Sequence, residues 1–452
     1  MAKKTLNYFL KRSLADEEAM HRGLDGEEDK IIRAYSQAQD YLNKRVSHIY
    51  KRYLNKSGLS EEEVKKVLNT TASATDLAEL QRLSQDIQSK ELKKDVADYL
   101  TGVAVKYRIT LLEDLKAKAY VLAKQIADVE LEVATDFYID TIHEAHDQAA
   151  AEAIVGKAET VAKIDDSKHI PKYVSKKKEQ LLEIHDNETG KVVKTINLTT
   201  DTNVPKFKEL STKYVKNILE SEWKGSNYSK RIWNDTDLLA KRLEELFAVK
   251  NMTGMSEKEM TDALAKEFDT SKYVARRLVR TEANYFAGQA KLKGWKEHGV
   301  TQYVLIAVLD FRTSEICRNI DGEIFDISKV ITGKNYPPLH PFCRTIAIAY
   351  FGKRTLDGVR TANDPLTNKT FEIDQRNNYK EWEQLLIKKH SKEEVLIARK
   401  KAKNFNSDLK QFNRYKSILK GSAPNTLSDF QSVKYGNKTA YNELKKRHMK
   451  AR

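Results

Sequence analysis

The chain has 452 residues, of which 40% are hydrophobic and 32% are charged, so it is long enough for two or three domains and too apolar to be disordered. It has no run of about 18 to 20 apolar residues and its first residues are polar, which excludes a membrane span and a signal peptide and predicts a cytoplasmic protein. The two cysteines, Cys317 and Cys343, exclude a disulfide framework.

Residues 1–164 have the pattern of long amphipathic helices. Between Gly102 and Gly156 the chain has neither glycine nor proline, and apolar residues recur at spacings of three and four. This stretch predicts one or two long helices, either as an extended helical arm or as a bent helical hairpin. Residues 29–55 show a second helical pattern, and Ser60, which precedes three glutamates, is typical of a capped helix start.

The composition changes at residues 165–206. The first proline of the chain is Pro171, a run of three lysines follows, and the next segment resembles a short β-hairpin that turns at residues 187–190. We therefore expect a linker or an inserted hairpin at 165–206.

Helical patterns return from residue 207 and include a start at Ser256, and two apolar runs at 303–309 and 345–351 predict strands. The expected fold is α+β and predominantly α-helical. It comprises a long N-terminal helical arm (1–164), the linker or hairpin (165–206), a central α+β domain with a small antiparallel sheet (207–352) and a basic helical tail (353–452).

A group of possible metal ligands lies between the two predicted strands. Cys317 precedes a predicted turn at Asp321-Gly322, and His340 and Cys343 follow a predicted turn at Pro337-Pro338. Thiolate and imidazole donors from two turns are typical of a tetrahedral zinc site, with Asp310 or water as a fourth ligand. The alternative is two buried thiols and a hydrogen-bonded histidine. A disulfide is disfavoured in a reducing cytoplasm.

Several spaced residues around these ligands form a more specific pattern. In chain order they are Arg280-Thr281-Glu282, Asp310-x-Arg312-Thr313, Cys317, Asp321-Gly322, Phe325 and Pro337-Pro338-x-His340-Pro341-x-Cys343-Arg344. This order resembles the head-morphogenesis domain of phage minor head proteins, the Mu F-like group, over roughly residues 210–352. Members often have cysteine where this chain has Ser314, and that departure removes one expected metal ligand.

We expect structural roles for the other motif residues. Arg344 is expected to bridge a carboxylate such as Glu282 or Asp321, Gly322 to supply a positive φ, and Asp310 and Arg312 to pair with each other's neighbours. Arg280 and Glu282, two positions apart on a predicted helix, point to different faces, which argues against an ADP-ribosyl-transfer site.

The basic character of the chain lies in its tail. Residues 353–452 contain 24 Lys+Arg and 11 Asp+Glu, a net charge of +13 out of the +15 of the whole chain. We expect an Asn/Asp/Pro-rich linker near residues 363–365 and then a charged helix over about 378–420. The densest basic cluster is Arg399, Lys400, Lys401 and Lys403. Such a field suits nonspecific binding of double-stranded DNA, and a solvated tail is the alternative.

The resemblance implies a function as a structural, non-enzymatic minor head protein, or minor capsid protein. Such a protein acts in head morphogenesis, at procapsid assembly. Its implied partners are the portal protein, the major capsid or scaffolding protein and the packaged DNA, with which it leaves on ejection. Its implied place is the virion, inside the head near the portal, after assembly in the host cytoplasm. The competing hypothesis is a metal-dependent nuclease or other DNA-modifying enzyme centred on His340 and Asp310. Neither a phosphate-binding glycine loop nor a Gly-x-Ser-x-Gly elbow is present in the sequence.

Overall fold

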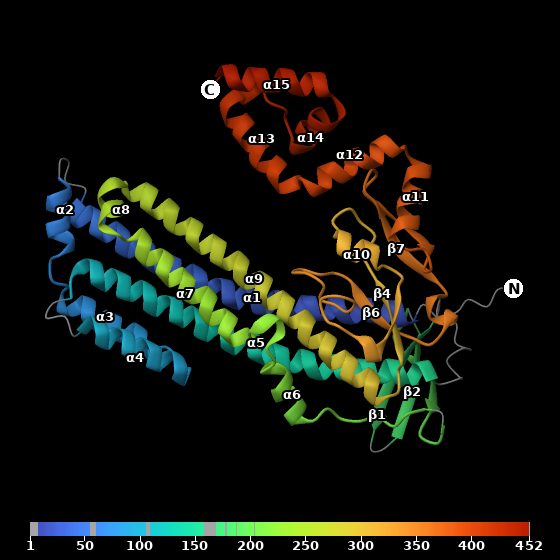
Figure 1. Ribbon diagram of the computed structural model, residues 1–452. Coiled ribbons are helices and arrows are strands. Elements are labelled where there is room, and N and C mark those ends of the chain that lie inside the picture. The colour runs from blue at the N-terminus through green and yellow to red at the C-terminus, as the bar shows by residue number, and fades with distance from the viewer. Residues whose placement is uncertain are drawn as a thin grey trace.

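The computed structural model describes residues 8–54, 60–104, 109–157, 169–176, 179–186, 188–202 and 204–451. Figure 1 shows an elongated bundle of long helices, with small sheets at one end and a separate group of C-terminal helices. The helices are α1 (Tyr8–Ile49), α2 (Glu61–Leu68), α3 (Ala74–Gln85), α4 (Lys90–Ala104), α5 (Leu111–Lys157), α6 (Thr212–Leu219), α7 (Tyr228–Leu246), α8 (Val249–Gly254), α9 (Glu257–Glu297), α10 (Glu315–Asn319), α11 (Tyr379–Lys389), α12 (Lys392–Lys403), α13 (Phe405–Leu419), α14 (Leu427–Gly436) and α15 (Lys438–Ala451). The strands are β1 (His169–Lys176), β2 (Glu179–Asp186), β3 (Val192–Asn197), β4 (Gln302–Ile306), β5 (Ile324–Asp326), β6 (Ile346–Tyr350), β7 (Val359–Asp364) and β8 (Lys369–Asp374).

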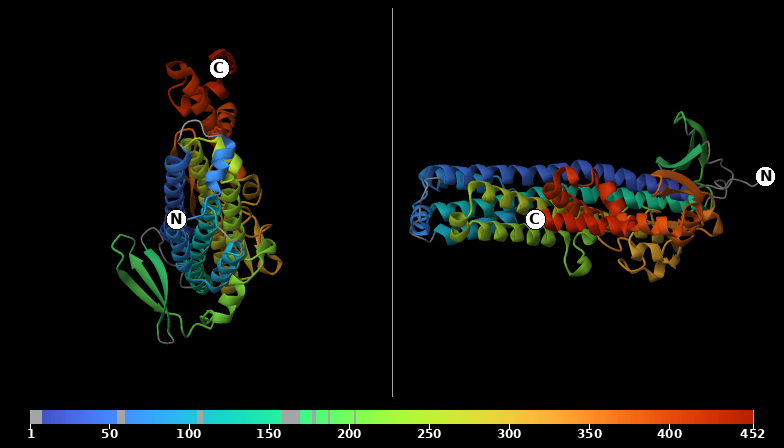
Figure 2. Two further views of the ribbon diagram at one scale, coloured as in Figure 1. Left: turned by 90° about the vertical axis from the view of Figure 1, so that its left-hand side faces the viewer. Right: turned by 90° about the horizontal axis from the view of Figure 1, so that it is seen from above.

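The bundle is built from α1, α5, α7 and α9, which run side by side over most of their length (Figure 2). Helix α5 is 47 residues long and is packed by α1, α3, α4, α7 and α9. Buried side chains occupy nearly its whole circumference, as expected for a helix at the centre of a bundle. The glycine-free stretch is therefore divided between two helices. Residues 103 and 104 end α4, and residues 111–155 lie on α5, which is one continuous helix and is not bent into a hairpin.

Local signals placed several helix starts correctly. Ser60 and Ser256 cap α2 and α9, and each accepts a hydrogen bond from the backbone N–H three residues later. Residues 29–49 of the helical pattern predicted at 29–55 form the second half of a longer helix, α1, which begins at Tyr8, and residues 50–54 form a π-helical turn after it. The last residue of the predicted pattern, Asn55, lies outside the described residues.

Three small antiparallel sheets accompany the bundle: the first lies between α5 and α6 in the chain, and the other two follow α9. The first has the order β1-β2-β3, the second β5-β4-β6, and the third is the β7-β8 hairpin. The predicted hairpin corresponds to β2 and β3, and Gly190 takes φ +67° in its turn, while Asn187 lies outside the described residues. The two predicted apolar strands are β4 and β6, which pair directly with each other.

The β4-β6 pair is buried on both faces, which explains its continuous apolar sequence. Val304 and Ile348 pack with Leu182 and Ile184 of β2, and Tyr303 and Leu305 lie on the opposite face. That second face packs against small residues of α5 and against the C-terminal part of α9, so the sheet is attached to the end of the bundle.

The tail differs from the prediction in two places. The residues read as a linker near 363–365 end β7 and begin the turn to β8. The single helix predicted over 378–420 is three helices, because Ser391 caps a new helix start at α12 and α13 begins after Asn404. The capping residues are polar and sit within a charged sequence, where helical periodicity alone does not reveal the break.

One hydrophobic core joins the N-terminal helices to α6, α7, α8 and α9. Residues of the predicted arm, such as Leu42 and Ile142, share that core with Leu243 and Phe286 of the predicted central domain. Among the described helices, none is long and apolar enough to cross a membrane.

Candidate functional site

The three predicted metal donors come together beside the β4-β6 pair. Cys317 lies on α10, and His340 and Cys343 lie in the loop that leads into β6. The Cys317 Sγ is 3.1 Å from the His340 Nε2 and 3.9 Å from the Cys343 Sγ. One ligand atom from each residue fits within 4.8 Å of the others, and both cysteines are buried.

The spacing of the two sulfurs fits a metal ion of the zinc type, whereas the 3.1 Å between the Cys317 Sγ and the His340 Nε2 is a hydrogen-bond distance, shorter than the roughly 3.6 Å that Zn–S and Zn–N bonds would set. With Zn–S bonds of about 2.3 Å, two thiolates of a tetrahedral site lie roughly 3.8 Å apart. The observed separation of the Cys317 and Cys343 sulfurs is 3.9 Å. The His340 Nδ1 lies 2.8 Å from the Pro341 carbonyl oxygen, to which it donates, so the lone pair of Nε2 is directed at Cys317. A backbone carbonyl in this position fixes a metal-binding histidine in its ligating tautomer.

The two thiols differ in pKa. The hydrogen bond from the Cys343 thiol, supported by the hydroxyls of Ser314 and Thr345, lowers the pKa of Cys317 to about 6 despite its burial. The same hydrogen bond, together with burial, raises the pKa of Cys343. Cys317 is thus the side of the pair on which a thiolate forms first.

Asp310 does not join the three donors. Its two carboxylate oxygens accept hydrogen bonds from Arg344 at 2.7 and 2.8 Å, and one oxygen also accepts the backbone N–H groups of Arg312 and Thr313. Burial opposes ionisation, yet the Arg344 guanidinium lowers the pKa of Asp310. The expectation that Arg344 pairs with Glu282 or Asp321 is wrong. Asp310 follows the end of β4 and Arg344 precedes the start of β6, so the antiparallel pairing of these strands brings the two together, and Asp310 binds both guanidinium nitrogens.

Asp321 is held by a residue that the sequence analysis missed. Both of its oxygens accept from Arg360 of β7 at 3.1 to 3.2 Å, and the Ala307 N–H donates to it at 2.7 Å. Gly322 has φ +82°, as predicted for the turn that follows. A lone arginine 39 positions downstream carries no sequence signal that connects it to Asp321.

Arg280 and Glu282 lie on α9 and face different neighbours, as their spacing predicted. Arg280 pairs with Asp25 and Glu28 of α1. Glu282 is buried and contacts Arg231 of α7. Burial raises the pKa of Glu282 to about 7, against the effect of the neighbouring guanidinium. Both residues therefore connect helices of the bundle.

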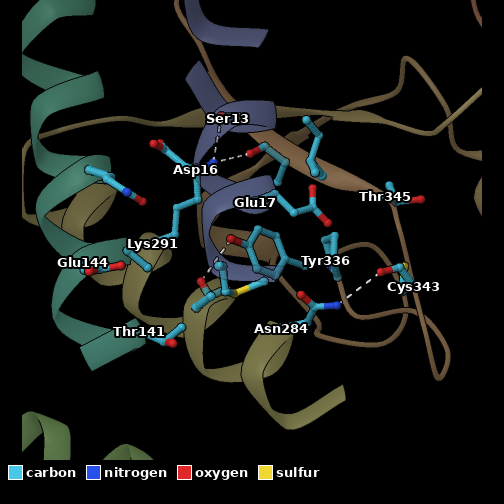
Figure 3. A pocket seen from close by; sticks show the side chains of 18 of the residues that line it. Ser13, Asp16, Glu17, Thr141, Glu144, Asn284, Lys291, Tyr336, Cys343 and Thr345 are labelled. Carbon is cyan, nitrogen blue, oxygen red and sulfur yellow. Dashed lines mark hydrogen bonds between the residues drawn. The ribbon is translucent and has the colours of Figure 1, made fainter. Parts of the chain in front are cut away.

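A cavity lies between the bundle and the cysteine loop (Figure 3). The side chains that line it include Asp16 of α1, Glu144 of α5, Lys291 of α9 and Cys343. The Lys291 ammonium donates to the Ser13 hydroxyl at 3.0 Å and to the Ala347 carbonyl at 2.7 Å. The Asn284 amide donates to the Cys343 carbonyl at 3.2 Å. These bonds attach the cysteine loop and β6 to the bundle helices.

The predicted DNA-binding cluster on α12 is divided between two roles. Arg399 pairs with Glu383 of α11 at 2.5 Å and lies over the Phe311 ring, so it holds α12 to the hairpin region. Lys401 donates to Ser432 of α14 at 2.9 Å. Lys400 and Lys403 are exposed.

A denser basic surface lies on the last three helices. Residues 404–452 contain 11 Lys+Arg and 3 Asp+Glu, a net charge of +8. One of these acids, Asp408, is buried and bound by Lys434 at 2.6 Å, so it contributes little to the surface. The exposed cations of this module, defined as α13–α15, are Lys410, Arg414, Lys416, Lys420, Lys438, Lys445, Lys446, Arg447 and Lys450.

The segment that carries the cysteine and histidine donors is similar to a phage protein family. Residues 243–348 match the family model described as Phage Mu protein F like protein, which covers less than a quarter of the chain. The matched segment runs from the end of α7 through α9 to β6 and contains all the motif residues singled out in the sequence. No curated protein and no solved structure matches the chain.

Proposed function

We propose that this protein is a structural minor head protein of a tailed phage that contacts packaged DNA. The Mu F-like match at residues 243–348 carries the proposal. The motif residues whose contacts the structure gives hold neighbouring helices, strands and turns together, which suits a structural role. Its partners in this proposal are the portal protein and the major capsid or scaffolding protein. It assembles in the host cytoplasm, is incorporated inside the head near the portal and leaves with the DNA.

The DNA contact is assigned to the module α13–α15. The net charge of +8 over residues 404–452 and the nine exposed cations of the module support the assignment. Binding through phosphates alone needs no sequence-reading element, because counterion release supplies the free energy. The cluster on α12 contributes Lys400 and Lys403 at most, since Arg399 and Lys401 already have partners within the protein.

We also propose one zinc ion at Cys317, His340 and Cys343. When bound there, zinc supplies a cross-link between α10 and the loop before β6, which are otherwise joined by weak contacts of sulfur and imidazole. The spacing of the sulfurs and the fixed tautomer of His340 support the assignment.

The test of DNA contact uses two adjacent exposed lysine pairs in the full-length protein. Lys445→Glu/Lys446→Glu changes α15, and Lys65→Glu/Lys66→Glu makes the same change on α2, at the far end of the bundle. We expect the α15 change to weaken duplex binding and to reduce the slope of log K against log salt by about 2, because each lost phosphate contact removes roughly 0.9.

The α2 change should leave DNA binding unaltered. Equal effects of the two lysine pairs would contradict DNA contact through the module. Cleavage of the DNA in the same samples that requires metal and is lost in His340→Ala would show an enzyme instead.

A further inference from the structure

The zinc site proposed above has three protein donors, and the identity of the fourth decides what the site can do. Among the described residues, no other histidine, cysteine or carboxylate joins the group of Cys317, His340 and Cys343. Structural zinc sites have four protein ligands, whereas sites with three keep a position that exchanges ligands.

Ser314 and Asp310, the two positions considered for a fourth protein ligand, are committed elsewhere. Ser314 caps α10, and its hydroxyl oxygen accepts the Cys317 N–H at 3.3 Å. A neutral hydroxyl is not among the usual zinc donors. The Asp310 carboxylate is bound by both nitrogens of Arg344. Neither side chain is free to complete a tetrahedral site.

The group also lies close to solvent on one side. Both cysteines are buried, but His340 is half-buried, and Pro341 and Phe342 beside it are exposed. On α10, Ile316 next to Cys317 is 51% exposed. A small donor can therefore reach the group from the side of the histidine loop.

From these contacts we propose that Cys317, His340 and Cys343 form an open zinc site, whose fourth position takes an exogenous donor such as an imidazole or a thiol. This proposal rests on zinc binding at the three residues. Ser314 is the position from which the protein can close the site, since its side chain already lies against Cys317. A cysteine at this position would supply a fourth protein ligand.

The experiment uses reduced full-length protein with Co²⁺ as a spectroscopic substitute for Zn²⁺ and free imidazole as the probe. We expect one Co²⁺ to bind with thiolate charge-transfer absorption, and imidazole to change the visible ligand-field bands. In Ser314→Cys the bands should not respond to imidazole, and Zn²⁺ measured by chelator competition should bind roughly tenfold or more tightly, about 1.4 kcal/mol.

The controls separate the proposal of an open fourth position from the proposal of zinc binding at the three residues. His340→Ala should abolish the charge-transfer absorption while keeping its helical circular dichroism, and His143→Ala, at an exposed position of α5, should bind as the unchanged protein does. Co²⁺ binding that ignores imidazole in the unchanged protein would overturn the open position and leave the zinc site standing. Absence of thiolate absorption would overturn both, and neither result would bear on DNA binding by α13–α15.

Discussion

The Asp321–Arg360 pair is buried on both sides, with 0% and 4% of the two side chains exposed. Burial raises the pKa of Asp321 against the effect of the arginine. A buried carboxylate is tolerated because Arg360 and the Ala307 N–H satisfy its oxygens. The pair also connects β7 to the turn after α10, and so links the hairpin to the Mu F-like segment.

Replacement of Arg360 by methionine should therefore destabilise the protein strongly. Removing one partner of a buried pair leaves an uncompensated charge and costs about 3–5 kcal/mol. Arg376→Met is the matched control, because Arg376 is 59% exposed and its pair with Asp357 should contribute less than about 1 kcal/mol. Urea unfolding measures the free energy of unfolding of both variants. Equal stability of the two variants would contradict this argument, because the buried pair would then contribute no more than the exposed one.

At this scale, the sequence predicted residue types better than partners. Cys317, His340 and Cys343 could be grouped because thiols and imidazole are rare and closely spaced here, and the structure places them together. The partner of Arg344 was wrong and the partner of Asp321 was missed, because charged residues are abundant and their pairing depends on how distant segments pack. The metal itself stays a prediction.

At the scale of single elements, α5 contains a buried acid that has no cationic partner in contact among the described residues. Glu130 is 2% exposed and accepts a hydrogen bond from Tyr35 of α1 at 3.2 Å. Burial raises its pKa to about 8 although that hydrogen bond opposes the rise. The folded protein thus holds Glu130 protonated under conditions in which the unfolded chain ionises it.

This shift predicts a loss of stability with rising pH. Because the pKa of Glu130 is higher in the folded protein than in the unfolded chain, its contribution to the free energy of unfolding is complete below about pH 4.5. This contribution is lost as the pH rises to about 8. Over that window the free energy of unfolding should fall by about 1 kcal/mol per pH unit. Glu130→Gln should remove the Glu130 share of this slope and leave the share of Glu282, whose pKa is also raised, and Glu132→Gln, exposed on the same helix, should retain the whole slope. A slope that is unchanged in Glu130→Gln would show that other groups cause it.

The close contact between α5 and α9 gives a second prediction. A Cβ atom at Gly294 would lie 2.7 Å from the His146 carbonyl oxygen and 2.9 Å from the Ala149 Cβ, so Gly294→Ala forces two long helices apart. We expect a loss of about 1–3 kcal/mol. Gly102→Ala on α4 meets nothing within 4 Å and should stabilise by about 0.5–1 kcal/mol through helix propensity. Thermal unfolding should show midpoints that move in opposite directions; a shared direction would contradict the packing argument.

Elements were predictable where one local signal dominated. The absence of glycine and proline over 103–155 and the cap at Ser256 predicted α5 and the start of α9. The β7–β8 hairpin was missed because its turn residues also fit a linker, and the pairing of its strands is not a local property. The break between α11 and α12 was hidden within the polar and charged segment KKHSKEE at 388–394.

On the scale of the whole molecule, the module α13–α15 has a core of its own. Phe412, Tyr415, Phe430 and Leu444 form a cluster separate from the bundle and from the core around Trp382. Helix α12 connects the two cores. Its Val395 packs with Trp382, whereas the Lys401 ammonium donates to Ser432 of α14 and the Lys401 carbonyl accepts a hydrogen bond from Gln431 of α14. Removal of residues after Gly352 would also expose Phe311 and Leu309, so it is a poor test of the module.

A single core substitution tests both the independence of this module and its role in DNA binding. Phe430 is fully buried, and Phe430→Ala should cost about 3–5 kcal/mol, which is sufficient to unfold so small a core. We expect the module's amides to lose protection in hydrogen exchange and DNA binding to fall, while the bundle keeps its unfolding midpoint. Phe405→Ala, at a position 52% exposed, controls for loss of an aromatic ring and should change neither property. A lower midpoint of the bundle in Phe430→Ala would mean that the two parts fold as one unit, and undiminished DNA binding would place the contact outside α13–α15.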